Sequence, residues 1–108
     1  MLFERNVAGV FRTTREGRIL DCNSAFADAL GYDSREDLLS REVWELYGQR
    51  ADREAFLDRL DRTPAMTNYR IRLKRKDGSA MHAVVNVAII PDESGAQLLG
   101  TLVEEKAD

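Results

Sequence analysis

Two short stretches near the N-terminus are rich in apolar and β-branched residues, which predicts a pair of strands. Val7 to Thr14 (VAGVFRTT) reads as the first strand, and Arg18 to Cys22 (RILDC) as the second. Glu16-Gly17 lies between them and is a turn signal, because glycine adopts the backbone angles that tight turns need. We therefore expect an antiparallel hairpin at the start of the chain.

Between residues 23 and 62 the pattern changes to the spacing of three and four that is typical of helices. Asn23 is suited to cap a first short helix, because its side-chain oxygen can accept from free amides of the first turn. Gly31 is suited to end that helix in a left-handed conformation. A second short helix is predicted from Ser34, with Asp37 three residues later in a capping-box-like arrangement.

Two further helices are predicted before residue 64. In SREVWELYG, the residues Val43, Trp44 and Tyr47 are predicted to share one face. The segment ADREAFLDRLDRTP gives the clearest helical pattern, because its apolar residues form one stripe and a proline follows its end. That stripe consists of Phe56, Leu57 and Leu60.

After Pro64 the period becomes two, which predicts three strands. NYRIRLK alternates apolar and basic residues, and Asp77-Gly78 then favours a hairpin of type I′, whose two central residues both need positive φ. AMHAVVNVAII is partly apolar on both alternating sets, so we expect a central strand that is at least half covered on its second face. AQLLGTLVEE is the last predicted strand.

Composition narrows the class of protein. The chain has 108 residues, of which 44% are hydrophobic, so it is sized for one domain with one modest core. Its formal net charge of −3 argues against a nucleic-acid partner. We expect no direct membrane contact, because neither an apolar span nor a signal-peptide pattern is present. A single cysteine, Cys22, cannot form an internal disulfide, which favours a reducing, cytoplasmic location.

Several short motifs occur in a characteristic order from Leu2 to Glu104. They are Gly9-Val10-Phe11, Gly17-Arg18-Ile19, Asp21-Cys22-Asn23, Ala25-Phe26, Leu30-Gly31-Tyr32, Ser34 to Leu38, Arg53 to Leu60, Lys76-Asp77-Gly78-Ser79, Asp92 to Gly95 and Gly100-Thr101. Together they resemble the motifs of PAS domains. The resemblance implies an α+β fold with a five-stranded antiparallel sheet, order 2-1-5-4-3, and several short helices on one face.

The resemblance also sets the expected limits of the domain. A single PAS domain would span residues 1–108, with residues 1–6 as a lead-in and residues 104–108 as the start of a C-terminal linker. One departure concerns that linker. Many PAS domains end their last strand with an Asp-Ile-Thr-like signature, whereas this chain reads Val103-Glu104-Glu105-Lys106.

The function that the resemblance implies is that of a non-catalytic sensory and dimerisation module. The domain would relay a ligand- or partner-induced change to a C-terminal output domain, with a sensor histidine kinase as the expected parent. Its partners would be a second copy, neighbouring domains of the same chain and a small-molecule ligand. The alternative is a ligand-free interaction module in a diguanylate cyclase or a transcription regulator. A third hypothesis, an enzyme-like domain that converts a bound compound, has almost no support in the sequence.

No cofactor, metal site or catalytic residue is predicted. Flavin is disfavoured because Cys22 follows a strand and lacks the Asn-Cys-Arg-Phe-Leu-Gln-like helical motif of flavin photoreceptors. Haem is disfavoured because His82, the only histidine, lies on a predicted strand rather than a helix. A single imidazole also cannot make a zinc site without other ligands. A serine nucleophile at Ser24 or Ser79 would need His82 beside it, and no elbow motif surrounds either serine.

Apolar residues predicted to face the space between helices and sheet are either core or the wall of a ligand pocket. These pocket candidates are Phe26, Leu30, Trp44, Tyr47, Phe56, Leu60, Ile71, Leu73, Val85, Val87 and Leu99. Few candidate inward groups can fix a charged ligand, so we expect a small apolar or weakly polar ligand if one binds.

A second set of residues is assigned to a dimer interface on the outer face of the sheet and the lead-in. The interface candidates are Leu2, Phe3, Arg70, Arg72, His82 and Val84. The alternative interpretation of the basic row that includes Arg70 and Arg72 is a solvated or salt-bridged face. Structural roles in turns and caps are assigned to Asp21, Asn23, Gly31, Asp77 and Gly78.

Overall fold

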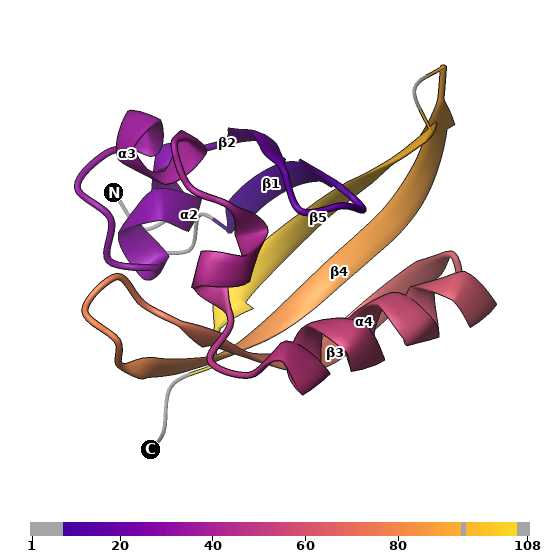
Figure 1. Cartoon of the computed structure of the whole chain (residues 1–108). Helices are drawn as coiled ribbons and strands as arrows, with labels where there is room; N and C mark the ends of the chain where they lie inside the picture. Colours follow the sequence, from indigo (N-terminus) through magenta and orange to yellow (C-terminus); the bar gives the residue numbers. More distant parts are fainter. Residues whose placement is uncertain (1–7, 94, 106–108) are drawn as a thin grey trace.

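One antiparallel sheet of five strands forms the back of the molecule (Figure 1). The computed structural model describes residues 8–93 and 95–105. Its strands are β1 (Gly9–Thr14), β2 (Ile19–Cys22), β3 (Ala65–Lys74), β4 (Ala80–Asp92) and β5 (Gly95–Glu104). They lie in the order β2-β1-β5-β4-β3, which confirms the predicted topology. The predicted lead-in 1–6, with Leu2 and Phe3, lies outside the described residues, as do residues 106–108 of the linker.

Four short helical segments connect β2 to β3 and cover one face of the sheet (Figure 1). They are α2 (Ser24–Ala29), α3 (Arg35–Leu39), the 3₁₀ helix η1 (Val43–Leu46) and α4 (Arg50–Arg62). In the described part of the chain, no helix is long and apolar enough to span a membrane.

Asn23 joins the first strand to the first helix. Its Oδ1 accepts from the backbone N–H of Phe26, which caps α2, at 3.0 Å. The same oxygen accepts from the N–H of Val10 at 2.9 Å, and Nδ2 donates to the carbonyl of Ala8 at 3.0 Å. Gly31 follows the helix with φ +78°, the left-handed conformation that glycine adopts without steric cost.

Arg35 fastens the next helix to β2. Its Nη2 donates to Asp21 at 2.6 Å, and its Nε donates to the carbonyl of Cys22 at 2.7 Å. Asp21 also accepts from the N–H of Cys22 at 2.9 Å. The hydrogen bond from Arg35, followed by that from Cys22, holds the pKa of the Asp21 carboxyl below its usual value.

The turn between β3 and β4 differs from the predicted type I′. Of its two central residues only Gly78 has positive φ, at +91°. The carbonyl of Arg75 accepts from the N–H of Gly78 at 2.9 Å, and the Asp77 carboxylate accepts from the N–H of Ser79 at 2.9 Å. The prediction was wrong because this side-chain bond supports Asp77 in a wider turn that needs only one left-handed residue.

The core lies between the helices and the inner face of the sheet. On β4 the inward set includes Met81, Ala83 and Val85, each at most 2% exposed. On β5 it includes Leu98 and Leu102, also at most 2% exposed. Side chains of the intervening residues stand on the outer face, because successive residues of a strand point to opposite sides.

Candidate functional site

A small cavity of about 40 Å³ opens within this core, between the sheet and the segments η1 and α4. One water molecule needs roughly 10–15 Å³, so the space is large enough for a small molecule of a few non-hydrogen atoms. The lining residues are Phe11, Thr13, Phe26, Val43, Leu46, Tyr47, Arg53, Phe56, Ile71, Leu73, Val85, Leu98 and Leu102. Eleven of these residues are hydrophobic, which makes the cavity an apolar site with two polar exceptions.

The structure brings six of the pocket candidates to the cavity wall. They are Phe26, Tyr47, Phe56, Ile71, Leu73 and Val85. Leu30, Leu60 and Val87 are also buried, at 0%, 0% and 4% exposure, but none of the three lines the cavity. These three belong to the hydrophobic core outside the cavity wall.

Two pocket candidates were wrong. Trp44 is 37% exposed because η1 is a 3₁₀ helix: three residues per turn place Val43 and Leu46 inward and Trp44 a third of a turn away. Leu99 is 41% exposed on the outer face, and its neighbour Leu98 takes the inward position. In a strand, a shift of one residue exchanges the inner and outer faces. Because Leu98 and Leu99 are adjacent and both apolar, the sequence does not show which of them faces inward.

The two polar groups at the cavity, Arg53 and Thr13, were missed in the sequence. Arg53 is 2% exposed and Thr13 is 5% exposed. A signal for Arg53 was present, because it precedes Phe56 by three residues and Leu60 by seven, which places it on the buried stripe of α4. For Thr13 the signal was its alternation with Phe11 along β1.

Arg53 is held by one backbone oxygen and three aromatic rings. Its Nη2 donates to the carbonyl of Arg15 at 3.1 Å. The guanidinium carbon lies 5.7 Å from the ring centre of Tyr47, 5.9 Å from that of Phe56 and 6.0 Å from that of Trp44. Such distances suit cation–π attraction.

Two polar atoms at the cavity make no hydrogen bond within the described residues. Nε of Arg53 and Oγ1 of Thr13 are both buried, and neither has a hydrogen-bond partner there. A buried polar atom without a partner costs about 1–3 kcal/mol, so the site gains if another molecule supplies one. Burial raises the pKa of the Tyr47 hydroxyl beside them, and the nearby Arg53 opposes that shift.

The comparisons with known proteins agree with this architecture. A family model described as "PAS domain" matches residues 7–105. This chain belongs to the PAS domain family. A comparison with curated protein sequences found no match.

Solved PAS domains share the fold at low sequence identity. One from a two-component sensor histidine kinase is 19% identical with a TM-score of 0.75, covering 96% of this chain and 90% of its own. A domain of a sensory box sensor histidine kinase/response regulator from Geobacter sulfurreducens is 25% identical with a TM-score of 0.66, covering 94% and 86%. The PAS domain of a LuxR-family transcriptional regulator from Burkholderia thailandensis, in complex with ethanol, is 21% identical with a TM-score of 0.74, covering 93% and 90%.

Residues considered for redox or metal chemistry lie away from this PAS cavity. Cys22 ends β2 with 6% exposure and does not line the cavity. Burial raises the pKa of its thiol, which disfavours the reactive thiolate. Among the described residues, no three or more histidine, cysteine, aspartate or glutamate side chains gather as metal ligands.

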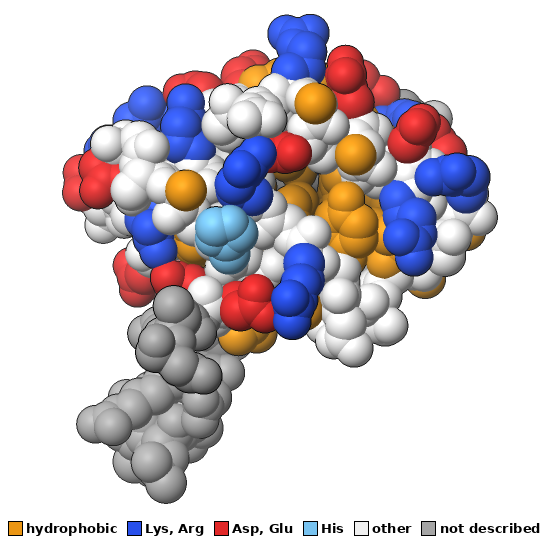
Figure 2. Space-filling model, turned by 90° about the horizontal axis from the view of Figure 1, so that it is seen from below, with side chains coloured by type: hydrophobic (Ala, Val, Ile, Leu, Met, Phe, Trp, Pro, Cys, Tyr) orange, Lys and Arg blue, Asp and Glu red, His pale blue; other side chains and the backbone are white. Residues whose placement is uncertain are grey.

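The interface candidates within the described residues stand on the outer face of the PAS sheet. Arg70 pairs with Glu105 at 3.2 Å and Arg72 with Asp52 at 3.2 Å. His82 is exposed and Val84 is half-buried. Figure 2 shows basic and acidic side chains interspersed around apolar ones on the side that carries the single histidine, so the charge there is mixed rather than uniformly basic.

Proposed function

We propose that this PAS domain is the sensing and dimerisation module of a sensor histidine kinase and relays a change to an output domain C-terminal to it. PAS domains are generally non-catalytic sensory modules, and two of the similar structures come from sensor histidine kinases. The observation that carries the proposal is the cavity between helices and sheet, where two buried polar atoms have no partner among the described residues. Such a site favours a small ligand as the signal.

Strand β5 offers a direct route from the cavity to the rest of the protein. Leu98 and Leu102 line the cavity, whereas Leu99 and Val103 of the same strand face outward. A ligand that packs better with one position of β5 would favour that position, because a ligand shifts an equilibrium only through its differential affinity. The end of this strand leads into the predicted linker, so its position would reach the output domain.

The proposed dimer forms between two copies through the outer face of the sheet. Val10, Leu99 and Val103 are 39%, 41% and 55% exposed there, although all three are apolar. Register places Val10 opposite Thr101 and Val103 opposite Val84, so these side chains lie over adjacent strands. A patch of this kind pairs with itself across a two-fold axis, and Arg70 with Glu105 supplies both signs of charge at its edge.

Native mass spectrometry of the purified domain at several concentrations, followed by denaturing spectra, tests the proposal. We expect an extra mass that disappears on denaturation and a dimer whose fraction rises with concentration. A clean apo mass together with that dimer would contradict the ligand and favour the ligand-free interaction module. The modest cavity volume of about 40 Å³ is the observation that supports this second candidate.

A further inference from the structure

Within the part of the chain that the structure describes, the buried guanidinium of Arg53 has no carboxylate partner. No ion pair of Arg53 occurs within residues 8–93 and 95–105, and the acidic groups near it serve other cations. Asp52, its neighbour in α4, pairs with Arg72 at 3.2 Å. Asp61, eight residues further along α4, accepts from both terminal nitrogens of Arg15 at 2.7 and 2.8 Å. Arginine stays protonated in proteins, so a positive charge lies at the cavity with no counterion among the described residues.

The unpartnered hydroxyl of Thr13 further restricts the chemical class of the ligand. Arg53 comes from α4 and Thr13 from β1, and both line the same cavity. Nε of Arg53 can only donate, whereas the hydroxyl of Thr13 can donate or accept. A carboxylate has two oxygens that accept in one plane, and its bonds with arginine are among the strongest hydrogen bonds in proteins.

The other lining residues of the cavity limit the size and polarity of the rest of the ligand. Apart from Arg53 and Thr13, every lining residue is apolar or aromatic, which suits methylene groups. A volume of about 40 Å³ admits only a short chain. A second charged group on the ligand would meet no opposite charge among these side chains, whose one polar atom is the Tyr47 hydroxyl, and burying that group would cost several kcal/mol. The site therefore suits one charge and a small apolar tail.

We propose that the cavity binds a short aliphatic monocarboxylate. Its carboxylate accepts hydrogen bonds from the Arg53 guanidinium and the Thr13 hydroxyl, and its alkyl chain packs against the apolar wall. This inference rests on the proposed sensory function and names its ligand class. It replaces the sequence-based expectation of an apolar or weakly polar ligand, because the buried Arg53 lines the site.

Titration calorimetry of the intact 108-residue chain with sodium butyrate, 1-butanol and butyramide tests the charge requirement. Sodium chloride at matched ionic strength serves as the blank. We expect butyrate to bind about tenfold or more tightly than either neutral compound, because a charge-assisted bond is roughly twice as strong as a neutral one. The Nε–Hε signal of Arg53 in a ¹⁵N NMR spectrum should shift with butyrate on the same binding curve.

Three variants assign the effect to the proposed residues. Arg53→Met should weaken butyrate about tenfold or more while leaving 1-butanol unchanged, and Thr13→Val should weaken butyrate several-fold. Arg59→Met is the matched control, because it removes an exposed arginine from the same helix. Circular dichroism checks that each variant folds. If Arg53→Met does not fold, Thr13→Val and the Arg53 signal in the native chain still decide the question.

The outcomes separate this inference from the proposed function. Equal affinity for butyrate and 1-butanol, or butyrate binding that Arg53→Met leaves intact, would overturn the carboxylate while a ligand-sensing role stands. No binding of any of the three compounds, together with a clean apo mass in native spectra, would overturn both. A mass adduct that is neutral rather than acidic would overturn the carboxylate alone.

Discussion

Single side chains in this protein hold several segments at once. Asn23 uses one oxygen to cap α2 and to accept from Val10, and uses its amide nitrogen to reach the carbonyl of Ala8. An N-cap alone needs only the oxygen, as at Ser34, whose hydroxyl accepts from the N–H of Asp37 at 3.0 Å. Asn23 is therefore a junction between strand and helix as well as a cap.

Asn23→Ala should lower the free energy of unfolding by about 2–3 kcal/mol, because three hydrogen bonds are lost and partly buried groups remain. Ser34→Ala is the matched control, since it removes one cap bond and should cost about 1 kcal/mol. Urea unfolding followed by circular dichroism measures both. Equal losses in the two variants would show that the bonds to Val10 and Ala8 contribute nothing.

Gly100 on β5 is required by space rather than by backbone angle. An added Cβ would lie 2.6 Å from the carbonyl oxygen of Asn86 and 2.6 Å from Cζ of Phe11. Gly100→Ala should therefore destabilise the fold by about 1–3 kcal/mol through overpacking. Gly48→Ala is the control, because nothing lies within 4 Å of its added Cβ. Thermal unfolding of the two variants checks this, and a Gly100→Ala midpoint equal to that of the control would refute the steric argument.

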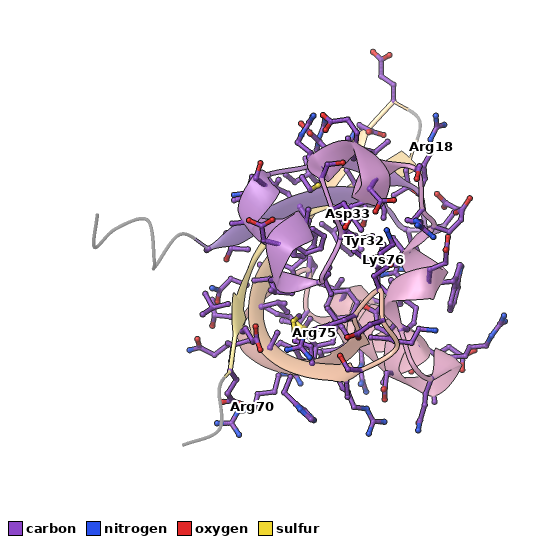
Figure 3. The ribbon with its side chains drawn as sticks, turned by 90° about the vertical axis from the view of Figure 1, so that its left-hand side faces the viewer. Arg18, Tyr32, Asp33, Arg70, Arg75 and Lys76 are labelled. Carbon is purple, nitrogen blue, oxygen red and sulfur yellow. The ribbon has the colours of Figure 1, made fainter. Side chains whose placement is uncertain are left out.

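At the scale of elements, the β3–β4 turn is docked against the helical layer (Figure 3). The backbone N–H of Lys76 donates to the carbonyl of Leu30 at 2.9 Å. Its Nζ lies 2.7 Å from Asp37 and 3.1 Å from Asp33, and Tyr32 is beside it with the ring centre at 5.8 Å. The turn thereby fixes the ends of α2 and α3 relative to the sheet.

This cluster predicts a dependence of stability on pH. The hydrogen bond from Lys76 is the main cause that lowers the pKa of Asp37 from its ordinary 3.8, and Asp37 is the main cause that raises the pKa of Lys76 from 10.5. A lowered carboxyl pKa gives stability that is present above pH 3.8 and is lost as the pH falls through the folded pKa. A raised lysine pKa gives stability that is present below pH 10.5 and is lost as the pH rises through the folded pKa.

Lys76→Met should therefore be less stable than the native chain at neutral pH, and the difference should shrink as the pH falls below 3.8. Lys74→Met is the control, because no ion pair of Lys74 occurs within the described residues. Urea unfolding at a series of pH values measures the difference. A constant gap between Lys76→Met and the native chain across that range would contradict the role of the ion pairs.

At the scale of the whole molecule, strands β4 and β5 contribute residues both to the cavity and to the outer face of the sheet. Their inner residues form the floor of the cavity, and their outer residues form the apolar patch proposed for dimerisation. Under the proposed function, a ligand that packs against Leu98 or Leu102 would move the same backbone that carries Leu99 and Val103. Ligand binding at the inner face and dimerisation at the outer face would then be coupled through the backbone of the same strands.

Leu99→Glu should abolish self-association without unfolding the domain, because a charge on the apolar patch must be desolvated at the interface. Ala55→Glu on α4 introduces the same charge at an exposed position elsewhere and should leave the dimer intact. Sedimentation velocity at several concentrations measures both. An unchanged dimer constant in Leu99→Glu would place the interface away from this face of the sheet.

Local features of the fold were accessible from the sequence. The cap at Asn23 and the left-handed turn at Gly31 depend on residues close along the chain, and the structure contains both. The prediction of a type I′ turn was wrong because a hydrogen bond of the Asp77 side chain supports a different turn, which the composition does not reveal. The choice between Leu98 and Leu99 was also hidden, since both are apolar and only the pairing of β5 with β1 and β4 sets which one faces inward.

The sequence by itself determined the order of elements, the strand topology that the PAS motifs imply and six of the eleven hydrophobic residues of the cavity wall. The order of elements follows from periodicity and from turn and cap residues, which act over a few positions, whereas the strand topology was implied by the resemblance to PAS domains. Only the tertiary structure decided that Arg53 and Thr13 line the same cavity. Each has a buried polar atom with no hydrogen-bond partner in the described residues. That both residues line one cavity depends on how α4 lies against the rest of the fold, and packing between residues 40 positions apart is set by the whole core rather than by any local pattern.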